Sequence, residues 1–177
     1  MIEIYTDGSA KNNGSENNCG GFGVVALIED SSTKSGFRID YTISQQLDNV
    51  TNNQMELKAL IFALAATQTR YKNEKCIIKS DSAYCVNMFN DWIYNWHRNG
   101  WTRAKNQPIE NLDLVKQIWE YCKLEWPNFT VEKIPGHSGL LGNELADALA
   151  TNNEAKIQKI FEENDINYER TKNFDLQ

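Results

Sequence analysis

IEIYTD, residues 2–7, is the stretch that decides the fold: a short run of β-branched and aromatic residues that ends on a carboxylate. Such a run is typical of a strand, which we expect over residues 2–6. Two more strands are expected over residues 20–29 and 34–43, and in the latter apolar side chains alternate with polar ones. Three strands with no helix between them predict an antiparallel meander.

Helices and strands alternate beyond residue 50, and the first helix is the clearest because its apolar residues recur at helical spacing. We expect helices over residues 51–70, 82–89, 111–124 and 143–150, and strands over residues 76–79 and 128–134. Strands that are separated by helices usually join a sheet in parallel. The order therefore predicts an α/β fold, with a mixed sheet of about five strands flanked by α-helices.

The C-terminal part is the most polar. Residues 151–177 predict a disordered tail behind a folded domain over residues 1–150. Three apolar residues in this tail leave a second interpretation open, in which the tail extends the last helix or docks on the domain. They are Ile157, Ile160 and Phe161.

The composition excludes several classes of protein. The chain has 177 residues, 41% of them hydrophobic, so it is long enough to bury a core and too apolar to be disordered. A net charge of −6 argues against a protein that binds nucleic acid through a strongly basic surface. The sequence has no apolar run of membrane-spanning length, no signal-peptide pattern and no CxxC pair. We expect a cytoplasmic protein with no membrane association and with reduced, metal-free cysteines.

Four carboxylates stand where an acid is costly unless it has a partner. Asp7 and Asp81 each follow a predicted strand, Glu56 borders the apolar stripe of the long helix, and Asp147 interrupts an apolar helix. Any one of them alone could be a helix cap or part of a surface ion pair. Together, converging at the carboxyl ends of two strands, they would repel one another and attract Mg²⁺ or Mn²⁺. Two such ions about 4 Å apart suit in-line phosphodiester displacement.

Four separated motifs carry a resemblance to the type 1 ribonucleases H over residues 1 to about 150. They are TDGS (6–9), TNNQMEL (51–57), SDS (80–82) and GHSGLLGNELAD (136–147). The resemblance implies the ribonuclease H-like fold, with a five-stranded mixed sheet whose second strand is antiparallel to the others. It also implies endonucleolytic hydrolysis of the RNA strand of RNA–DNA hybrids, which leaves 5′-phosphate and 3′-hydroxyl ends.

The same resemblance implies roles for the carboxylates and for one histidine. Asp7 would bridge two Mg²⁺ ions, Asp147 would serve the ion that holds the attacking water, and Glu56 and Asp81 would serve the ion at the leaving 3′-oxygen. His137 would assist water activation or product release from a loop near the scissile phosphate. A histidine without this context is more often structural, although its usual pKa suits proton transfer near neutral pH.

Further residues are implied in binding the hybrid. The resemblance places Gly8, Ser9 and Glu56 at the ribose hydroxyls near the cut, and Asn52, Asn53 and Gln54 in the minor groove. It also implies that Asn13, Thr51 and Asn111 form a pocket for a DNA phosphate. For these asparagines the alternative is use in turns and helix caps.

A tryptophan-rich stretch over residues 91–107 follows the helix expected over residues 82–89. Trp96 and Arg98 are implied in the DNA-strand groove, where an aromatic ring packs on a sugar and a cation meets a phosphate. Core packing is the other interpretation, and we favour it for Trp92. Residues 91–110 hold three bases, Arg98, Arg103 and Lys105, against two acids. Because relatives often carry more, we expect weaker hybrid binding and few released counterions.

Three other functions compete with a free-standing ribonuclease H. Integrases, transposases and junction resolvases share the architecture, but the motifs at 51–57 and 136–147 favour ribonuclease H. A non-catalytic hybrid-binding module is disfavoured because all four acids are present. A domain excised from a polymerase is disfavoured by Met1 directly before the first strand. We expect a monomeric enzyme.

Overall fold

One sheet organises residues 1–11 and 18–166, which are the residues that the computed structural model describes. Within them, five strands lie in the order β3-β2-β1-β4-β5. The strands are β1 (Ile2–Lys11), β2 (Cys19–Glu29), β3 (Phe37–Asp48), β4 (Cys76–Ser80) and β5 (Phe129–Lys133). β2 is antiparallel to β1 and β3, whereas β4 is parallel to β1 and to β5. The predicted mixed sheet with an antiparallel second strand is confirmed.

β1 and β3 continue well beyond their predicted C-terminal ends, because pairing with β2 extends them. β1 continues beyond its apolar run to Lys11, which pairs with Cys19 of β2. β3 starts at Phe37 and reaches Asp48, which also pairs with Cys19. The polar residues at these ends carry little strand signal of their own, and the neighbouring backbone supplies the hydrogen bonds that keep them extended.

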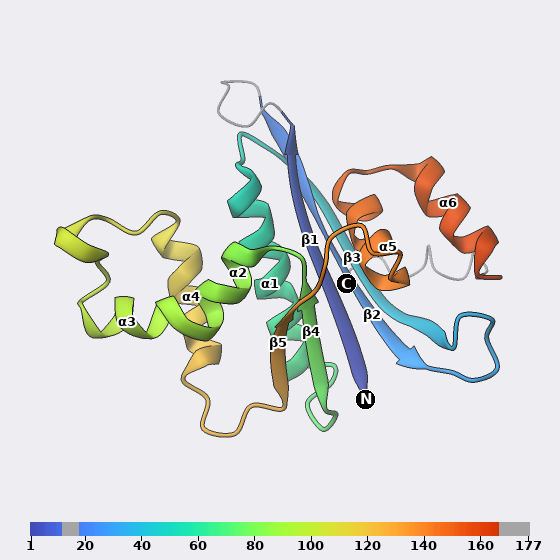
Figure 1. The fold of residues 1–177 in the computed structure, drawn as a ribbon, viewed down its shortest axis with the longest axis horizontal. Coiled ribbons are helices and arrows are strands. Elements are labelled where there is room, and N and C mark those ends of the chain that lie inside the picture. The colour runs from blue at the N-terminus through green and yellow to red at the C-terminus, as the bar shows by residue number, and fades with distance from the viewer. Residues whose placement is uncertain (12–17, 167–177) are drawn as a thin grey trace.

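Helices cover both faces of the sheet (Figure 1). α1 (Asn52–Gln68) contacts β1 and β2 and, on its other side, α4 (Leu112–Cys122). α5 (Leu141–Ala150) contacts β1, β2 and β3, and α6 (Glu154–Glu163) packs on α5. α2 (Ala83–Asn87), a π-helical turn (Met88–Trp92) and α3 (Ile93–Arg98) lead away from the sheet into a protrusion. A short 3₁₀ turn lies at Ala104–Asn106.

Alternate residues of the central strands contribute their side chains to two separate hydrophobic cores. Ile4, Phe22 and Val24 pack with α1 and α4 in one hydrophobic cluster. Tyr5 and Val25 point the other way, into a cluster with α5 and α6. This division follows from the two-residue period of a strand, which sends successive side chains to opposite faces.

The expectation of a disordered tail is wrong for the described part of the C-terminal segment. α6 forms there, and Ile157, Ile160 and Phe161 are buried in the second core. The alternative interpretation, docking on the domain through these three residues, is the one that the structure shows. Their spacing gives the helix one apolar face, which α5 and the sheet cover.

The structure offers no membrane-spanning helix among residues 1–11 and 18–166. None of its helices there combines the length and the hydropathy that crossing a bilayer requires.

Candidate active site

Asp7 and Asp81 come together because β1 and β4 are parallel neighbours. The last paired residues of these strands are Thr6 and Ser80. Asp7 and Asp81 are therefore the next residues of each chain at the same edge. The sequence predicts that β1 ends just before Asp7. The strand continues past this residue instead, because Asp7 still pairs with Gly23 of β2. Asp7 is thus held in a regular strand at the point where its other neighbour, β4, stops.

Glu56 reaches the same edge from the first turns of α1. The start of this helix is fixed by a capping box, in which Gln54 N donates to Thr51 Oγ1 and Thr51 N donates to Gln54 Oε1. Gly8 then lets the helix approach the strand, since a Cβ on Gly8 would overlap the backbone nitrogen of Glu56. The close approach of β1 and α1 delivers the Glu56 carboxylate to Asp7.

The three carboxylates form a tight, poorly compensated cluster. Asp7, Glu56 and Asp81 each offer an oxygen within 4.8 Å of the others. Asp7 and Glu56 are buried, and Glu56 Oε2 has no hydrogen-bond partner. Burial, followed by repulsion from Asp81 and Asp147, raises the pKa of Asp7 to about 7, although the Gly8 backbone and Lys156 oppose this. Burial, then Asp7 and Asp81, raises the pKa of Glu56 to about 9.

Such a cluster fits a hard divalent cation. Three oxygen donors already converge, one buried oxygen lacks a partner, and the charged forms are disfavoured until a positive charge arrives. No other group of three or more metal-ligating side chains stands this close together in the described ranges, 1–11 and 18–166. The cysteines in these ranges are free thiols, as predicted.

Asp147, the fourth predicted ligand, stands outside this trio. It lies on α5, which packs closely on β2 because a Cβ on Gly23 would overlap the carbonyl oxygen of Ala146. Asp147 Oδ2 accepts a hydrogen bond from Lys156 Nζ of α6 at 2.6 Å. The charge of Asp147 nonetheless acts on Asp7, after burial and Asp81, as a cause of its raised pKa. The structure thus brings Asp147 near the trio but pairs it with a lysine.

Two polar residues at the site escaped the sequence reasoning. Asn143 is buried on α5, and its Nδ2 donates to Asp81 Oδ2 at 3.4 Å. Its Oδ1 has no partner, which leaves a second unsatisfied buried oxygen beside the carboxylates. Lys156 is the other, and it also contacts Glu144 Oε2 at 2.7 Å. Asn143 stands within a motif that drew attention as a whole, whereas nothing in the sequence signals Lys156.

His137 lies in the loop between β5 and α5. It is exposed and has a left-handed backbone with φ of 50°. A non-glycine residue in this conformation is uncommon. His137 is not part of the carboxylate trio, so its predicted catalytic role stays a prediction.

The predicted ribose and minor-groove residues lie around the junction of β1 and α1. Gly8 is buried beside Glu56, and Ala10 N donates to Asn52 Oδ1 at 3.3 Å. The side chains of Thr51 and Gln54 form the capping box of α1, and their predicted binding roles stay predictions. Asn13, the remaining loop residue of this set, lies outside the described residues.

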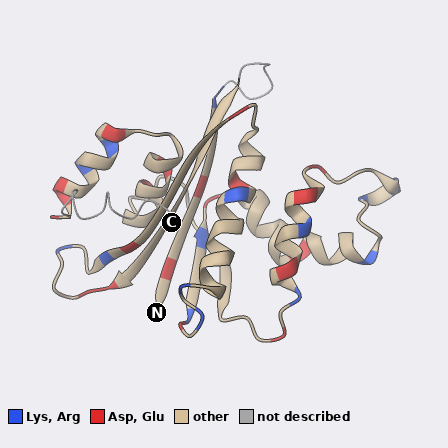
Figure 2. Cartoon of the chain, turned by 180° about the vertical axis from the view of Figure 1, so that it is seen from behind, with Lys and Arg blue, Asp and Glu red and all other residues tan. Residues whose placement is uncertain are grey.

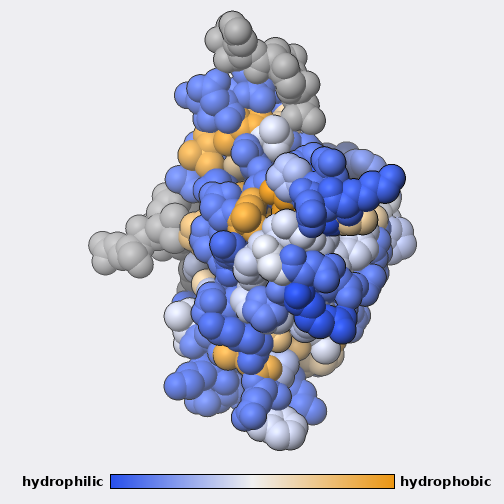
Figure 3. Space-filling view, turned by 90° about the vertical axis from the view of Figure 1, so that its left-hand side faces the viewer, coloured by the Kyte–Doolittle hydropathy of each residue, from blue (hydrophilic) through white to orange (hydrophobic). Residues whose placement is uncertain are grey.

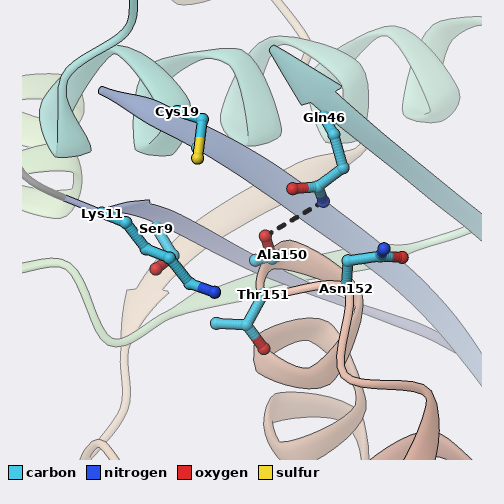
Figure 4. Close-up of a pocket in the computed structure, with 8 residues that line it drawn as sticks. Ser9, Lys11, Cys19, Gln46, Ala150, Thr151 and Asn152 are labelled. Carbon is cyan, nitrogen blue, oxygen red and sulfur yellow. Dashed lines mark hydrogen bonds between the residues drawn. The ribbon is translucent and has the colours of Figure 1, made fainter. Parts of the chain in front are cut away.

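Ser9 borders a cavity of about 240 Å³ where β1 ends and β2 begins (Figure 4). Lys11 and Cys19 line the same cavity, and Gln46 Nε2 closes one side by donating to Ala150 O at 3.1 Å. Ser9 thus links the carboxylate edge to a polar hollow over the end of α5.

A second cavity, of about 420 Å³, separates α1 from the protrusion. Its walls are Asn53, Tyr84, Trp92, Trp96, Arg103, Ile109 and Glu110. Trp92 and Trp96 pack on each other with ring centroids 6.0 Å apart, and both pack against the first core while bordering the cavity. Trp92 therefore packs on the core, as predicted, and the role of Trp96 in a DNA-strand groove stays a prediction.

Two predicted binding residues frame this region. Arg98 is exposed at the end of α3, where Nη2 donates to Asn95 Oδ1 at 2.7 Å. Asn111 precedes α4 in a left-handed conformation, with φ of 54°. α1 and α4 run side by side with their N-termini at the same end (Figure 1), so Thr51 and Asn111 each stand at a helix start on that end.

The protrusion is sparsely basic, as predicted. Figure 2 shows isolated Lys and Arg residues among acidic ones there, and Figure 3 shows small hydrophobic patches on a mostly hydrophilic face. Arg103 is partly neutralised, because its Nη2 lies 3.9 Å from Glu110 Oε1 and its Nε donates to Pro108 O. Lys116 of α4 adds one cation over the Trp101 ring.

Comparison with known proteins places this geometry in a family. The family model described as RNase H matches residues 1–155. The ribonuclease H of Caldanaerobacter subterraneus subsp. tengcongensis is 37% identical over 166 residues, which cover 93% of this chain and 95% of that protein. Among solved structures, the PFV RNase H domain is similar with a TM-score of 0.69 and 28% identity, over 85% of this chain and 92% of that one. LC11-RNase H1, solved in complex with an RNA/DNA hybrid, is similar with a TM-score of 0.56 and 25% identity, over 85% and 94%. The match over nearly the whole chain, together with the strand order and the acidic cluster, shows that this protein belongs to the ribonuclease H family, as a type 1 member.

Proposed function

We propose that the protein hydrolyses the RNA strand of RNA–DNA hybrids endonucleolytically and leaves 5′-phosphate and 3′-hydroxyl ends. The observation that carries this is the convergence of Asp7, Glu56 and Asp81 within 4.8 Å, where burial and mutual repulsion raise the pKa of Asp7 and of Glu56 and a bound cation would stabilise the charged forms. In a chain of the ribonuclease H family, such a cluster is suited to phosphoryl transfer.

The metal ligands in this proposal are the trio and Asp147. Two Mg²⁺ ions, or Mn²⁺ in their place, would supply Lewis acidity and an activated water. Asp7, at the centre of the edge, would contact both ions; Glu56 and Asp81 would share one, and Asp147 the other. Asn143 holds Asp81 in place by its amide. His137, on its exposed loop, would move a proton at the water or the leaving group.

The hybrid would lie across the edge, with its RNA strand on β1 and α1 and its DNA strand toward the protrusion. Groups that recognise ribose hydroxyls must be polar and close to the carboxylates, which fits the backbone of Gly8 and Ser9 and the side chain of Glu56. Asn52, Asn53 and Gln54 would contact the minor groove. The cavity between Asn53 and Trp96 would accept the DNA backbone, and the exposed Arg98 would meet a phosphate. The two helix starts at Thr51 and Asn111, with Asn13, suit a phosphate.

The organisation of the chain follows from the same proposal. Residues 1–150 would form the catalytic domain, with α6 as a helical addition to it. A monomer in the cytoplasm is the state that we expect for this enzyme.

The test is cleavage of labelled substrates in Mg²⁺. The protein should cut an RNA–DNA hybrid within its RNA strand and leave matched DNA and RNA duplexes intact. Each cut should leave a 3′-hydroxyl on one fragment and a 5′-phosphate on the next, so that a ligase can rejoin the two. Equal cutting of all three substrates, or an intact hybrid, would reject the proposal. EDTA should abolish cleavage, and excess Mg²⁺ should restore it.

A further inference from the structure

Lys156 places a positive charge directly on one of the proposed metal ligands. Its Nζ lies 2.6 Å from Asp147 Oδ2 and 2.7 Å from Glu144 Oε2. The three side chains are 24–30% exposed, so water screens this contact only in part. The charge also reaches the trio, since it opposes the burial and repulsion that raise the pKa of Asp7.

A docked helix, and not a loose tail, presents this lysine. Asn153 caps α6 by accepting a hydrogen bond from Lys156 N at 3.0 Å. The next residue, Ile157, is buried in the second core together with Ile160. The backbone of Lys156 is therefore fixed on both sides, while its side chain contacts two carboxylates, those of Asp147 and Glu144.

The side chain also has space to leave Asp147. Lys156 borders a cavity of about 450 Å³ between α5 and α6, and Glu144 and Glu163 stand on the wall of the same cavity. A lysine that gave up Asp147 would keep Glu144 as its partner and would move toward a second acid. Its withdrawal would thus leave no buried, unpaired charge.

We infer that the Lys156 ammonium is a built-in counter-ion for Asp147, which a divalent ion must displace before Asp147 serves as a ligand. The inference rests on the proposed function, because it takes Asp147 as a ligand. A metal ion and the ammonium compete for the same Oδ2, so Lys156 weakens metal binding at Asp147 and keeps this carboxylate compensated in the metal-free protein. Lys156 is a positioning residue in this scheme and contacts no substrate.

The test compares Mn²⁺ binding by the full chain and its variants, without nucleic acid, by electron paramagnetic resonance of the free ion. Lys156→Gln should bind Mn²⁺ about 2- to 5-fold more tightly at the site that includes Asp147, as expected for loss of a partly exposed ion pair. Lys159→Gln is the matched control, because it removes the same charge from the same helix and Lys159 lies 3.8 Å from Glu163. Lys156→Arg should behave like the unmodified protein, since it keeps the charge.

A second readout needs no variant. The ¹⁵N resonance of Lys156 Nζ in the unmodified protein should move as Mg²⁺ saturates the site, whereas that of Lys159 should not. Equal Mn²⁺ affinity of Lys156→Gln and Lys159→Gln, weaker binding by Lys156→Gln, or an unchanged Lys156 resonance would each overturn the inference. Hybrid cleavage by the unmodified protein is followed in the same buffer, and its absence would contradict the proposed function instead.

Discussion

Gly8 of β1 lies directly against the backbone nitrogen of Glu56 in α1, with no room for a side chain between them. This contact joins the two elements that carry the buried carboxylates, so the geometry of the metal site depends on a residue that has no functional group. The backbone there sets how far apart Asp7 and Glu56 stand.

Gly8→Ala should therefore damage stability and activity together. The added methyl group must push α1 from β1, which we expect to cost about 1–3 kcal/mol of the free energy of unfolding. Hybrid cleavage should fall more than about tenfold, because a small displacement of catalytic groups is costly. Urea unfolding and single-turnover cleavage measure the two effects. Ser9→Ala, the next residue along β1, should leave the free energy of unfolding within about 0.5 kcal/mol; an equal loss there would contradict the packing argument.

Asp7→Asn should abolish cleavage and stabilise the metal-free fold. The amide keeps the size of the side chain and removes a charge whose pKa is raised to about 7, first by burial and then by Asp81. At pH 8 in EDTA, we expect a gain of about 1–3 kcal/mol in the free energy of unfolding. Asp113→Asn, at an exposed position in the first turn of α4, should leave cleavage unchanged and should cost less than about 1 kcal/mol of the free energy of unfolding. A destabilised Asp7→Asn protein would show that the Asp7 charge is already compensated.

The metal-free protein should lose stability as the pH rises. The pKa values of Asp7 and Glu56 are raised on folding from 3.8 to about 7 and from 4.5 to about 9, so the folded state binds more protons than the unfolded chain. Their contribution is complete below about pH 4 and is lost as the pH rises through these folded values. Melting in EDTA between pH 5 and pH 9 measures this loss for the buried pair.

Divalent ions should reverse that loss. Mg²⁺ at about 100 times its dissociation constant should add about 2.7 kcal/mol to the free energy of unfolding. The gain should be larger at pH 8 than at pH 5, because protons compete for the same oxygens. Melting curves with Mg²⁺ and with EDTA at both pH values provide the measurement. A gain that is the same at both would exclude the carboxylates as the ligands.

Hybrid binding should depend only moderately on salt. The protrusion offers few cations, and Arg103 is already close to Glu110. We expect a slope shallower than about −6 in a plot of log affinity against log salt concentration. Arg98→Gln should make the slope about one unit shallower, if Arg98 meets a phosphate. A steeper slope for the unmodified protein would reveal basic contacts outside this region.

Removal of the apolar face of α6 should destabilise the whole domain. Ile160 is 7% exposed, and its truncation in Ile160→Ala leaves a cavity in the second core, at a cost of about 2–4 kcal/mol. Gln158→Ala, on the exposed side of the same helix, should cost less than about 0.5 kcal/mol. Thermal unfolding followed by circular dichroism measures both. Equal stability of the two variants would mean that α6 is not part of the cooperative fold.

The sequence by itself determined the order of the elements and the approximate place of three carboxylates. Strands and helices leave local signatures, since side chains repeat every two residues in one and every 3.6 in the other. Asp7 ends the apolar run of β1 and Asp81 follows β4, and parallel strands present their carboxyl ends at one edge. The four motifs then identified the family without any knowledge of distances.

Only the tertiary structure decided where the strands end, what α6 does and how Asp147 is held. Gly8 to Lys11 are extended because β2 pairs with them, and Ile157 and Ile160 are ordered because a second core accepts them. Lys156 meets Asp147 because α6 docks beside α5. Each of these outcomes depends on the free energy of contacts between separate elements, and the local pattern of residues carries no information about which partner will be present.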